Sequence, residues 1–473
     1  MIRTYGIGRR RYGCMDAKPT DPVTCRGCAA AAKRIADLEA RVAALEKMLR
    51  EAMRAGKRQA SPFSKGPPKA DPKTPGRKAG DGYGTKARRT VPTHVDEVHE
   101  AKLPAACPSC GSSVLPTHVA AQYQVEIPRR PVHRRFDVHV GRCRGCGKRV
   151  QGRHGLQTSD ALGACASQLG PDAQAAAVHL NKRAGLSHGK VKDFFRTLFG
   201  VGLSAGGSCQ AVLRAGRRCA GNYDAIVGHV RGSDRVVPDE TGWRVGGRPA
   251  WLHAFATPGA VAYLIDPRRG FDASEKVLGR DYAGHMTHDG WAPYRRFWRA
   301  THQLCLAHLL RRCGELLGVA TRGAVVFPRK VKAILQEALA VRDDRDAGRL
   351  SARRSRARAD DLQGRMARLV EPAKVHRANE TFAKHLWTYR LHLFTFLRHE
   401  RVDATNWRGE HALKPAVVNR KVWGGNRTEA GAEAQHVLMS VLQTAALRGI
   451  DSMRFLSSLL CSLPHQRPML LPA

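Results

Sequence analysis

Residues 234–289 carry the change of pattern that constrains the fold most strongly. Three short runs rich in β-branched and aromatic residues follow one another, with Gly or Pro turns between them: DRVVPDETGWRV, RPAWLHAFATP and AVAYLID. This pattern predicts three antiparallel strands. A helical stretch, ASEKVLGRDY, comes next, and GHMTHDGWAPY then predicts a short strand that ends in Asp289.

Three antiparallel strands, a helix and a parallel strand are the order of a ribonuclease-H-like α/β fold. In that order the ends of the first and fourth strands are neighbours, so we expect Asp239 and Asp289 to converge. Two carboxylates in a basic surrounding repel each other unless a divalent cation lies between them. An Asp after a strand is more often a turn or cap residue, so this pair alone does not establish a metal site. Glu240 is expected to lie behind the metal ligands or to form a salt bridge with a neighbouring strand, because adjacent strand residues point to opposite faces.

A third acid follows a long helical stretch. Glu410 lies in DATNWRGEHALKPAVVNRK, where the pattern places it in the first turn of a short helix. The basic residues that come after it are candidates for contacts with DNA phosphates: Lys414, Arg420 and Lys421.

The charge balance points to a polyanionic partner. The 473 residues contain 80 Lys and Arg against 40 Asp and Glu, a formal net charge of +40. Lys and Arg that meet phosphates release condensed counterions, so nucleic acid is the favoured partner. A basic surface kept for solubility or for anionic lipid is the alternative, but the excess runs through every segment. No apolar run is long enough for a membrane span and no secretory signal is recognisable, so a cytoplasmic, nucleoid-associated protein is expected.

Two Cys-x-x-Cys-Gly knuckles, CPSCG and CRGCG, are separated by 32 residues of alternating polar and apolar pattern. Such knuckles point two sulfurs at one ion, and four thiolates satisfy a tetrahedral Zn²⁺. The sequence therefore predicts a structural zinc ribbon, with unrelated buried cysteines as the alternative. The expected ligands are Cys107, Cys110, Cys143 and Cys146. A third pair, Cys25 and Cys28, has no matching second pair nearby.

Residues 29–54 predict a helix with the apolar stripe of a coiled coil, Ile35, Leu38, Val42, Leu45 and Leu49. Self-association through this stripe is one interpretation, and packing onto the chain's own body is the other. Further along, Ser187 and Ser204 stand where helix N-caps belong, in a segment of short helices that resembles a DNA reader but fits any small bundle.

These patterns indicate a multidomain α+β protein. The expected segments are an N-terminal extension (1–28), a coiled-coil helix (29–54), a basic Pro/Gly linker (55–94), a zinc ribbon (95–155), a helical unit that is a candidate for DNA contact (160–225), two parts of a ribonuclease-H-like core (230–310 and 401–462), a helical insertion between them (311–400) and a tail (463–473). The charged helix of the insertion suits either solvent or DNA.

The chain resembles the transposases of the sixty-six family of bacterial insertion sequences over nearly its whole length past Met15. The order of the matching parts is as informative as any single motif. They are KRQASPFSKGPPK with PGRKAGDG, CPSCG with CRGCG, GLSHGKVKDFFRTLFGVGLS, PDETGWRV, LGRDYAGHMTHDGWAPY, HQLCLAHLLRR, NWRGEHALKP and NRKVWGGNRTEAGAEA.

The resemblance implies an Asp-Asp-Glu transposase in which Asp239, Asp289 and Glu410 bind Mg²⁺ or Mn²⁺. It implies two-metal phosphoryl transfer: cleavage at the ends of the element, then joining of the 3′ hydroxyl to target DNA. Implied partners are the element ends, the target DNA and accessory proteins of the same element. A metal-dependent nuclease or resolvase on the same fold is one alternative, and a non-catalytic zinc-ribbon DNA-binding accessory protein is another.

HQLCLAHLLRR raises a separate question. His302, Cys305 and His308 occur at i, i+3 and i+6, which suggests a zinc triad. Positions i and i+6 of one helix lie on different faces, so helical geometry disfavours that interpretation. Cys305 and His308 share a face, and we expect them to pack beside the active site.

Overall fold

The computed structural model describes residues 33–46, 91–125, 127–162 and 167–471. The chain divides into two compact units, residues 1–123 and 124–473, and each is described by itself. The predicted N-terminal extension, most of the basic linker and the Cys25–Cys28 pair lie outside the described residues. In the described part of the chain no helix is long and apolar enough to cross a membrane.

The first unit contains a helix over residues 33–46, inside the segment for which the heptad pattern predicts one. Four residues of its apolar stripe, Ile35, Leu38, Val42 and Leu45, are each more than half exposed. The helix therefore buries none of this stripe within the described residues, and the choice between self-association and packing onto the chain stays open.

The second unit begins with a small hairpin made of β1 (Val140–Arg142) and β2 (Arg149–Gln151), which pair antiparallel. The alternating pattern predicts further strands before β1, yet residues 127–139 form none. Pro128 and Pro131 lack the N–H groups that a strand ladder needs. Ile127 and Val132 remain exposed, so this stretch also has no buried face that would fix a strand register.

A five-stranded mixed sheet forms the centre of the second unit. Its strands are β3 (Arg235–Val245), β4 (Arg248–Ala256), β5 (Val261–Asp266), β6 (His285–His288) and β7 (Thr301–Leu304). The spatial order is β5-β4-β3-β6-β7, in which β3, β4 and β5 are antiparallel and β6 and β7 run parallel to β3. The predicted succession of three antiparallel strands, a helix and a parallel strand is thus observed, and the helix is α6 (Phe271–Leu278).

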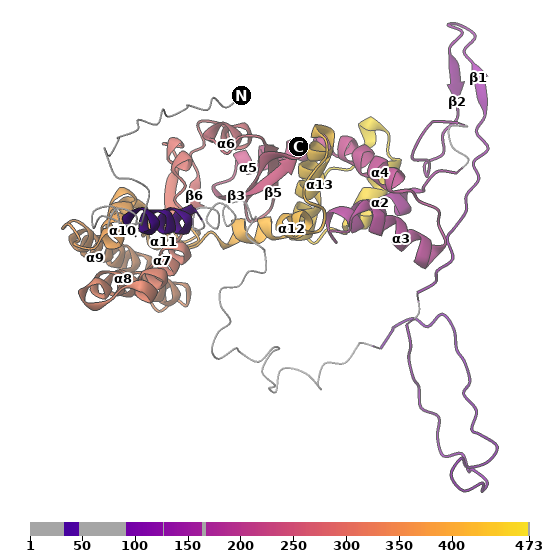
Figure 1. Ribbon diagram of the computed structural model, residues 1–473. Helices are drawn as coiled ribbons and strands as arrows, with labels where there is room; N and C mark the ends of the chain where they lie inside the picture. The colour runs from indigo at the N-terminus through magenta and orange to yellow at the C-terminus, as the bar shows by residue number, and fades with distance from the viewer. Residues whose placement is uncertain (1–32, 47–90, 126, 163–166, 472–473) are drawn as a thin grey trace, which may run out of the picture. The chain divides into compact units, whose positions relative to one another are not determined.

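Both faces of the sheet are covered, which explains why its strands read as nearly continuous apolar runs. Leu252, Ala254 and Tyr263 belong to a core shared with helix α12 (Trp407–Trp423). Phe255 and Ala262 belong to a core shared with α4 (Ala205–Arg218) and α5 (Ala220–Arg231). Figure 1 shows α12 and α13 (Glu429–Leu447) beside the sheet. Helices α5, α12 and α13 lie against the sheet, and α2 (Pro171–Lys182), α3 (His188–Phe199), α4 and α14 (Ser452–Cys461) pack on those helices or on one another. The short 3-10 turn η4 (Pro464–Gln466) follows α14.

The two predicted N-caps are confirmed. The hydroxyl oxygen of Ser187 accepts from the N–H of Lys190 at the start of α3, and that of Ser204 accepts from Gly207 at the start of α4. Each bond satisfies one of the N–H groups that the first turn of a helix leaves without a partner.

The chain between β7 and α12 is helical and has a hydrophobic core of its own. Figure 1 shows α8 and α9 side by side in this region. Its elements are α7 (Leu306–Val319), η2 (Arg322–Val325), α8 (Val326–Asp346), α9 (Ala352–Val370), α10 (Arg377–Thr388), η3 (Arg390–His392) and α11 (Thr395–Arg398). This core also includes Leu304 of β7, and Gln303 of the same strand donates to the carbonyl of Leu393, so the insertion packs on the β7 edge of the sheet.

Candidate active site

The register of β3 against β6 brings Asp239 and Asp289 to the same level of the sheet. Arg235 pairs with His285 in the parallel ladder, and each acid lies four residues further along its chain, at 239 and at 289. Asp239 lies within β3, opposite Ala254 of β4, and Asp289 directly follows the last residue of β6.

Glu410 reaches the same region through close packing of α12 on β3. A Cβ atom added to Gly409 would lie only 2.9 Å from the Cβ of Asp239 and 3.3 Å from the Cγ1 of Val237. Only glycine therefore lets the helix backbone approach the strand this closely. Glu410, the next residue, lies in the first turn of α12 beside Asp239.

The other two acids affect Asp239 electrostatically. The pKa of Asp239 is raised to about 7, chiefly by burial, and further by the negative charges of Glu240, Asp289 and Glu410. Among the described residues, no three His, Cys, Asp or Glu side chains converge closely enough to form a preformed metal site. The Glu410 carboxylate instead lies 3.9 Å from Nε2 of His308. The donors are nonetheless all carboxylate oxygens, which suit Mg²⁺, and a cation would offset the repulsion that raises the pKa of Asp239.

Glu240 forms a salt bridge, but its partner, Arg269, lies in the loop after β5 and not on a neighbouring strand. One carboxylate oxygen, Oε1, accepts from Nε and Nη2 of Arg269 at 3.1 and 2.8 Å. The other, Oε2, accepts from the hydroxyl of Tyr294 at 2.7 Å. Burial raises the pKa of Glu240, and these three bonds oppose that rise. The sequence offers no local signal for Arg269 or Tyr294, because they lie 29 and 54 positions from Glu240.

The turn that carries Asp289 is held by side chains on both sides. Oδ1 of Asp289 accepts from the N–H of Trp291 at 2.9 Å, and Nδ1 of His288 accepts from the N–H of Gly290 at 3.0 Å. Gly290 has a φ of 98°, and an added Cβ would meet Leu304 at 2.9 Å. A glycine is required here for both reasons, so the position of Asp289 is well defined.

The HQLCLAHLLRR segment is not one helix, and that expectation was wrong. His302 belongs to strand β7, Cys305 caps the start of α7 and His308 lies in its first turn. His302 is buried and bonds to His288 and to the carbonyl of Phe297, away from the other two residues.

Cys305 and His308 join the start of α7 to the start of α12. The sulfur of Cys305 lies 3.3 Å from Nδ1 of His308 and 3.3 Å from the backbone nitrogen of Asn406, the N-cap residue of α12. His308 in turn lies beside Glu410. These contacts agree with packing beside the carboxylates.

All three basic candidates for phosphate contact lie on α12, but their environments differ. Arg420 donates to Thr241 Oγ1 at 3.1 Å and to the carbonyl of Gly242, so its guanidinium ties α12 to β3. Lys414 and Lys421 are exposed. The lysines are therefore better candidates for a surface contact than the arginine.

The two cysteine knuckles have the same backbone geometry. In each, the first cysteine's N–H donates to the carbonyl five residues later, and the glycine N–H donates back to the first cysteine's carbonyl, at 2.8 or 2.9 Å. Gly111 and Gly147 have φ of 75° and 70°, as this turn requires. The pKa of Cys110 and of Cys143 is lowered, chiefly by backbone hydrogen bonds. The first knuckle belongs to the first unit and the other to the second.

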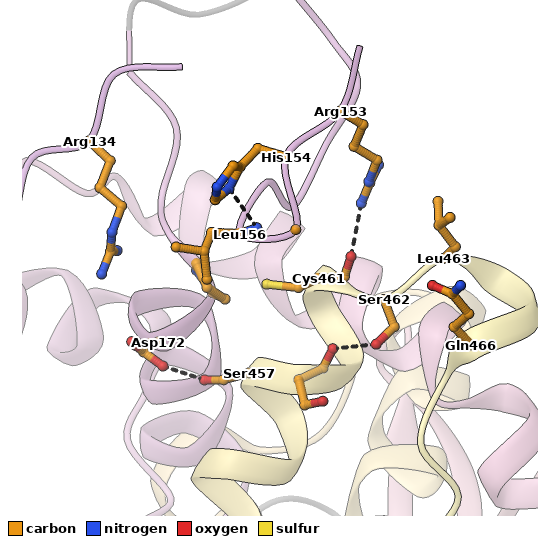
Figure 2. A pocket seen from close by; sticks show the side chains of 13 residues that line it. Arg134, Arg153, His154, Leu156, Asp172, Ser457, Cys461, Ser462, Leu463 and Gln466 are labelled. Atoms are coloured by element: carbon orange, nitrogen blue, oxygen red, sulfur yellow. Dashed lines mark hydrogen bonds between the residues drawn. The ribbon is translucent and has the colours of Figure 1, made fainter. Parts of the chain in front are cut away.

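A separate cavity of about 520 Å³ lies among the segment before α2, helix α2 and helix α14 (Figure 2). Its polar groups largely bond to one another: Asp172 accepts from Ser457, and Arg153 donates to the carbonyl of Cys461. Arg134 lines the same cavity. None of the three acids lines this cavity. The bond from Arg153 to the carbonyl of Cys461 joins the segment before α2 to helix α14.

Comparison with known proteins identifies the family. A family model described as "Transposase IS66 family" matches residues 166–434, a stretch that contains all three acids. Two uncharacterized proteins of Sinorhizobium fredii are similar to the chain. Protein y4qI is 26% identical over 281 residues (52% of this chain, 50% of y4qI), and y4hP is 24% identical over 278 residues (50% of this chain, 49% of y4hP). The chain thus spans about half the length of these curated relatives. Because the family model covers more than half of the chain, the protein belongs to the transposase IS66 family.

Proposed function

We propose that the protein cleaves DNA at the ends of an insertion sequence and joins the freed 3′ ends to target DNA, with Asp239, Asp289 and Glu410 as the catalytic acids. The observation that supports the proposal is that two parallel strands and a helix bring these acids to one region of the sheet, where the pKa of Asp239 is raised to about 7. Carboxylates crowd together at a buried position only at a free-energy cost, which a bound cation offsets.

The strand order supports a ribonuclease-H-like core. The order β5-β4-β3-β6-β7, with the first three strands antiparallel and the last two parallel to β3, is the order expected for that fold. Function rests on the acids and on the family, because one fold supports many activities.

The chain's own residues have distinct parts in the proposed reaction. Bound Mg²⁺ or Mn²⁺ ions supply activation of water and stabilisation of charge on the phosphate. Asp239 must be ionised to bind them, so its raised pKa is lowered when the cation binds. Glu240 has both oxygens occupied by Arg269 and Tyr294 and stays outside the metal shell. Lys414 and Lys421 are exposed on α12, and their exposure supports a contact with DNA phosphates.

The remaining parts of the proposal rest mainly on sequence. The matching geometry of the two knuckles supports Zn²⁺ binding by their four thiolates, since each presents the turn that such sites use. The exposed apolar stripe of the N-terminal helix supports self-association, because burial of that stripe would need a second helix. Accessory proteins of the same element and nucleoid DNA complete the expected partners.

The decisive experiment measures end cleavage and strand transfer with Mg²⁺ or Mn²⁺, on duplexes that carry the DNA flanking the coding region. We expect Asp239→Asn to lose at least about 100-fold of both activities, since one cation loses a charged ligand. Asp234→Asn is the matched control, because Asp234 is an exposed acid just before β3. Equal activity of wild type and Asp239→Asn would refute the catalytic assignment. Cleavage without joining would indicate a nuclease or resolvase, and no metal-dependent cleavage would indicate an accessory protein.

A further inference from the structure

Arg269, in the loop after β5, is held on three sides. Its Cζ lies 4.6 Å from the ring centroid of Trp251 and 5.0 Å from that of Trp291. Two of its nitrogens donate to Oε1 of Glu240. A guanidinium stacked on two indoles and bonded to a carboxylate has little conformational freedom left to lose.

Both carboxylate oxygens of Glu240 accept hydrogen bonds in this arrangement. Its side chain is 2% exposed, and its second oxygen is taken by Tyr294. A buried carboxylate costs free energy unless it is paired, and here the pairing of Glu240 also fixes the position of Arg269. Arg269 itself remains 43% exposed. Of the five N–H groups of its guanidinium, Glu240 takes two, so the edge away from Glu240 can still donate.

The residues that hold Arg269 are direct neighbours of the two strand acids. Glu240 follows Asp239 in β3, and its N–H donates to Oδ1 of Asp239 at 2.9 Å. The backbone N–H of Trp291 donates to Oδ1 of Asp289 at 2.9 Å. The fixed guanidinium therefore lies at the edge of the carboxylate cluster and not elsewhere on the basic surface.

We propose that Arg269 binds a phosphate of the DNA strand that enters the carboxylate site. The inference rests on the proposed function, because it assumes that DNA is the substrate there. A guanidinium matches a phosphate with two parallel N–H···O bonds, and it offsets the repulsion between the phosphate and three acids. Holding it in place beforehand lowers the entropy cost of binding.

The test measures DNA affinity without catalysis. The probe is a fluorescein-labelled 30-base-pair duplex, and its anisotropy is followed against protein at several KCl concentrations, with EDTA present. We expect Arg269→Ala to weaken binding about 5- to 20-fold and to reduce the slope of log K against log[KCl] by about 0.9, the value for one lost phosphate contact. Arg268→Ala is the matched control: Arg268 is the adjacent arginine, 75% exposed and paired with Asp272, and we expect at most a twofold loss.

A second variant distinguishes the loss of a DNA contact from losses of affinity caused by destabilisation or by a change in net charge. Arg269→Ala alone leaves Glu240 buried and unpaired, which destabilises the site. The double variant Arg269→Ala/Glu240→Gln removes that carboxylate, keeps an oxygen for Tyr294 and has the net charge of wild type. We expect a melting temperature near that of wild type and the same loss of affinity as in the single variant.

The outcomes separate the two proposals. Wild-type affinity and slope in the double variant, or equal losses for Arg269→Ala and Arg268→Ala, would overturn the role of Arg269 and leave the proposed function untouched. A wild-type protein that does not bind the duplex would instead overturn the proposed function itself.

Discussion

Nε2 of His288 lies 3.1 Å from Nδ1 of His302, and both rings are buried. The bonds around them define both tautomers. The Gly290 N–H donates to Nδ1 of His288, so the proton of His288 is on Nε2 and is donated to His302. His302 then carries its own proton on Nε2 and donates it to the carbonyl of Phe297 at 3.0 Å. Burial lowers the pKa of each ring, which keeps this chain of bonds neutral behind Asp289.

His302→Phe should destabilise the protein by about 1–3 kcal/mol, because it leaves the Nε2–H of His288 buried without a partner, whereas the carbonyl of Phe297 still accepts from the N–H of Ala300. Chemical denaturation measures the loss. His392→Phe is the control: its ring stacks 5.0 Å from His302, but its Nδ1 has no partner in the described part of the chain. Equal losses in the two variants would show that ring packing, not the relay, stabilises this region.

Asp239→Asn should stabilise the metal-free protein above pH 7 by roughly 2–4 kcal/mol, since a shift of one pKa unit corresponds to about 1.4 kcal/mol. The folded state keeps the proton of Asp239 to about pH 7, whereas its ordinary pKa is 3.8. The folded state therefore binds more protons between these values, and wild-type stability falls as pH rises through this window. Thermal melting with EDTA should show a gain at pH 8 and none at pH 4.

Asp266→Asn should change stability in the opposite direction to Asp239→Asn, because the pKa of Asp266 is lowered and not raised. Burial is the largest single effect on Asp266 and opposes its ionisation. The hydrogen bonds from Lys276 and from the N–H of Arg268, together with nearby positive charge, outweigh burial, and the pKa of Asp266 is lowered. Its stabilising contribution is present above its ordinary pKa and is lost as pH falls. This variant should therefore be less stable than wild type at pH 8. A gain in both variants at pH 8 would contradict the argument from charge crowding at Asp239.

Lys182→Met should raise stability by about 2–4 kcal/mol at pH 6. Burial lowers the pKa of Lys182 from 10.5 to about 7, and the ammonium is bonded to Gln435 with no carboxylate partner described. The unfolded chain binds more protons between pH 7 and 10.5, so wild-type stability rises with pH across that window. Melting curves should show that the variant lacks this rise. Lys190→Met, at an exposed position, should leave the pH profile unchanged.

The zinc prediction concerns metal content. We expect about one equivalent of zinc per chain, measured by elemental analysis, and its loss in Cys107→Ser. Cys461→Ser is the control, because Cys461 belongs to neither knuckle. Zinc content equal in Cys107→Ser and wild type would exclude Cys107 as a ligand.

The strands of the sheet could be predicted because their signals are local. DRVVPDETGWRV, RPAWLHAFATP and AVAYLID each combine β-branched residues with nearby turns, and β3, β4 and β5 are found there. Strand β7 was missed because its four residues, Thr301–Leu304, run directly into α7. Only Leu304 of these four residues is apolar, so the segment lacks the run of β-branched and aromatic residues that marks a strand.

The position of the three acids in the sequence and the family resemblance identify them as candidates. The residues that pack against them and bond to them could not be predicted in this way. The contact of Gly409 with Asp239 joins residues 170 positions apart, and nothing in the local pattern around either residue indicates it. The bonds from Arg269 and Tyr294 to Glu240 are equally non-local. Such contacts are set by tertiary packing, which a single sequence read by periodicity does not report.

The separate core of the insertion has a consequence during synthesis. The ribosome makes Asp239 and Asp289 early, and α7 to α11 can then assemble around their own apolar side chains before Glu410 emerges. Domains fold as units while translation proceeds. On the proposed mechanism, a nascent or prematurely terminated chain carries two of the acids but not the third. On that mechanism, DNA cleavage requires helix α12, which is made only after the whole insertion.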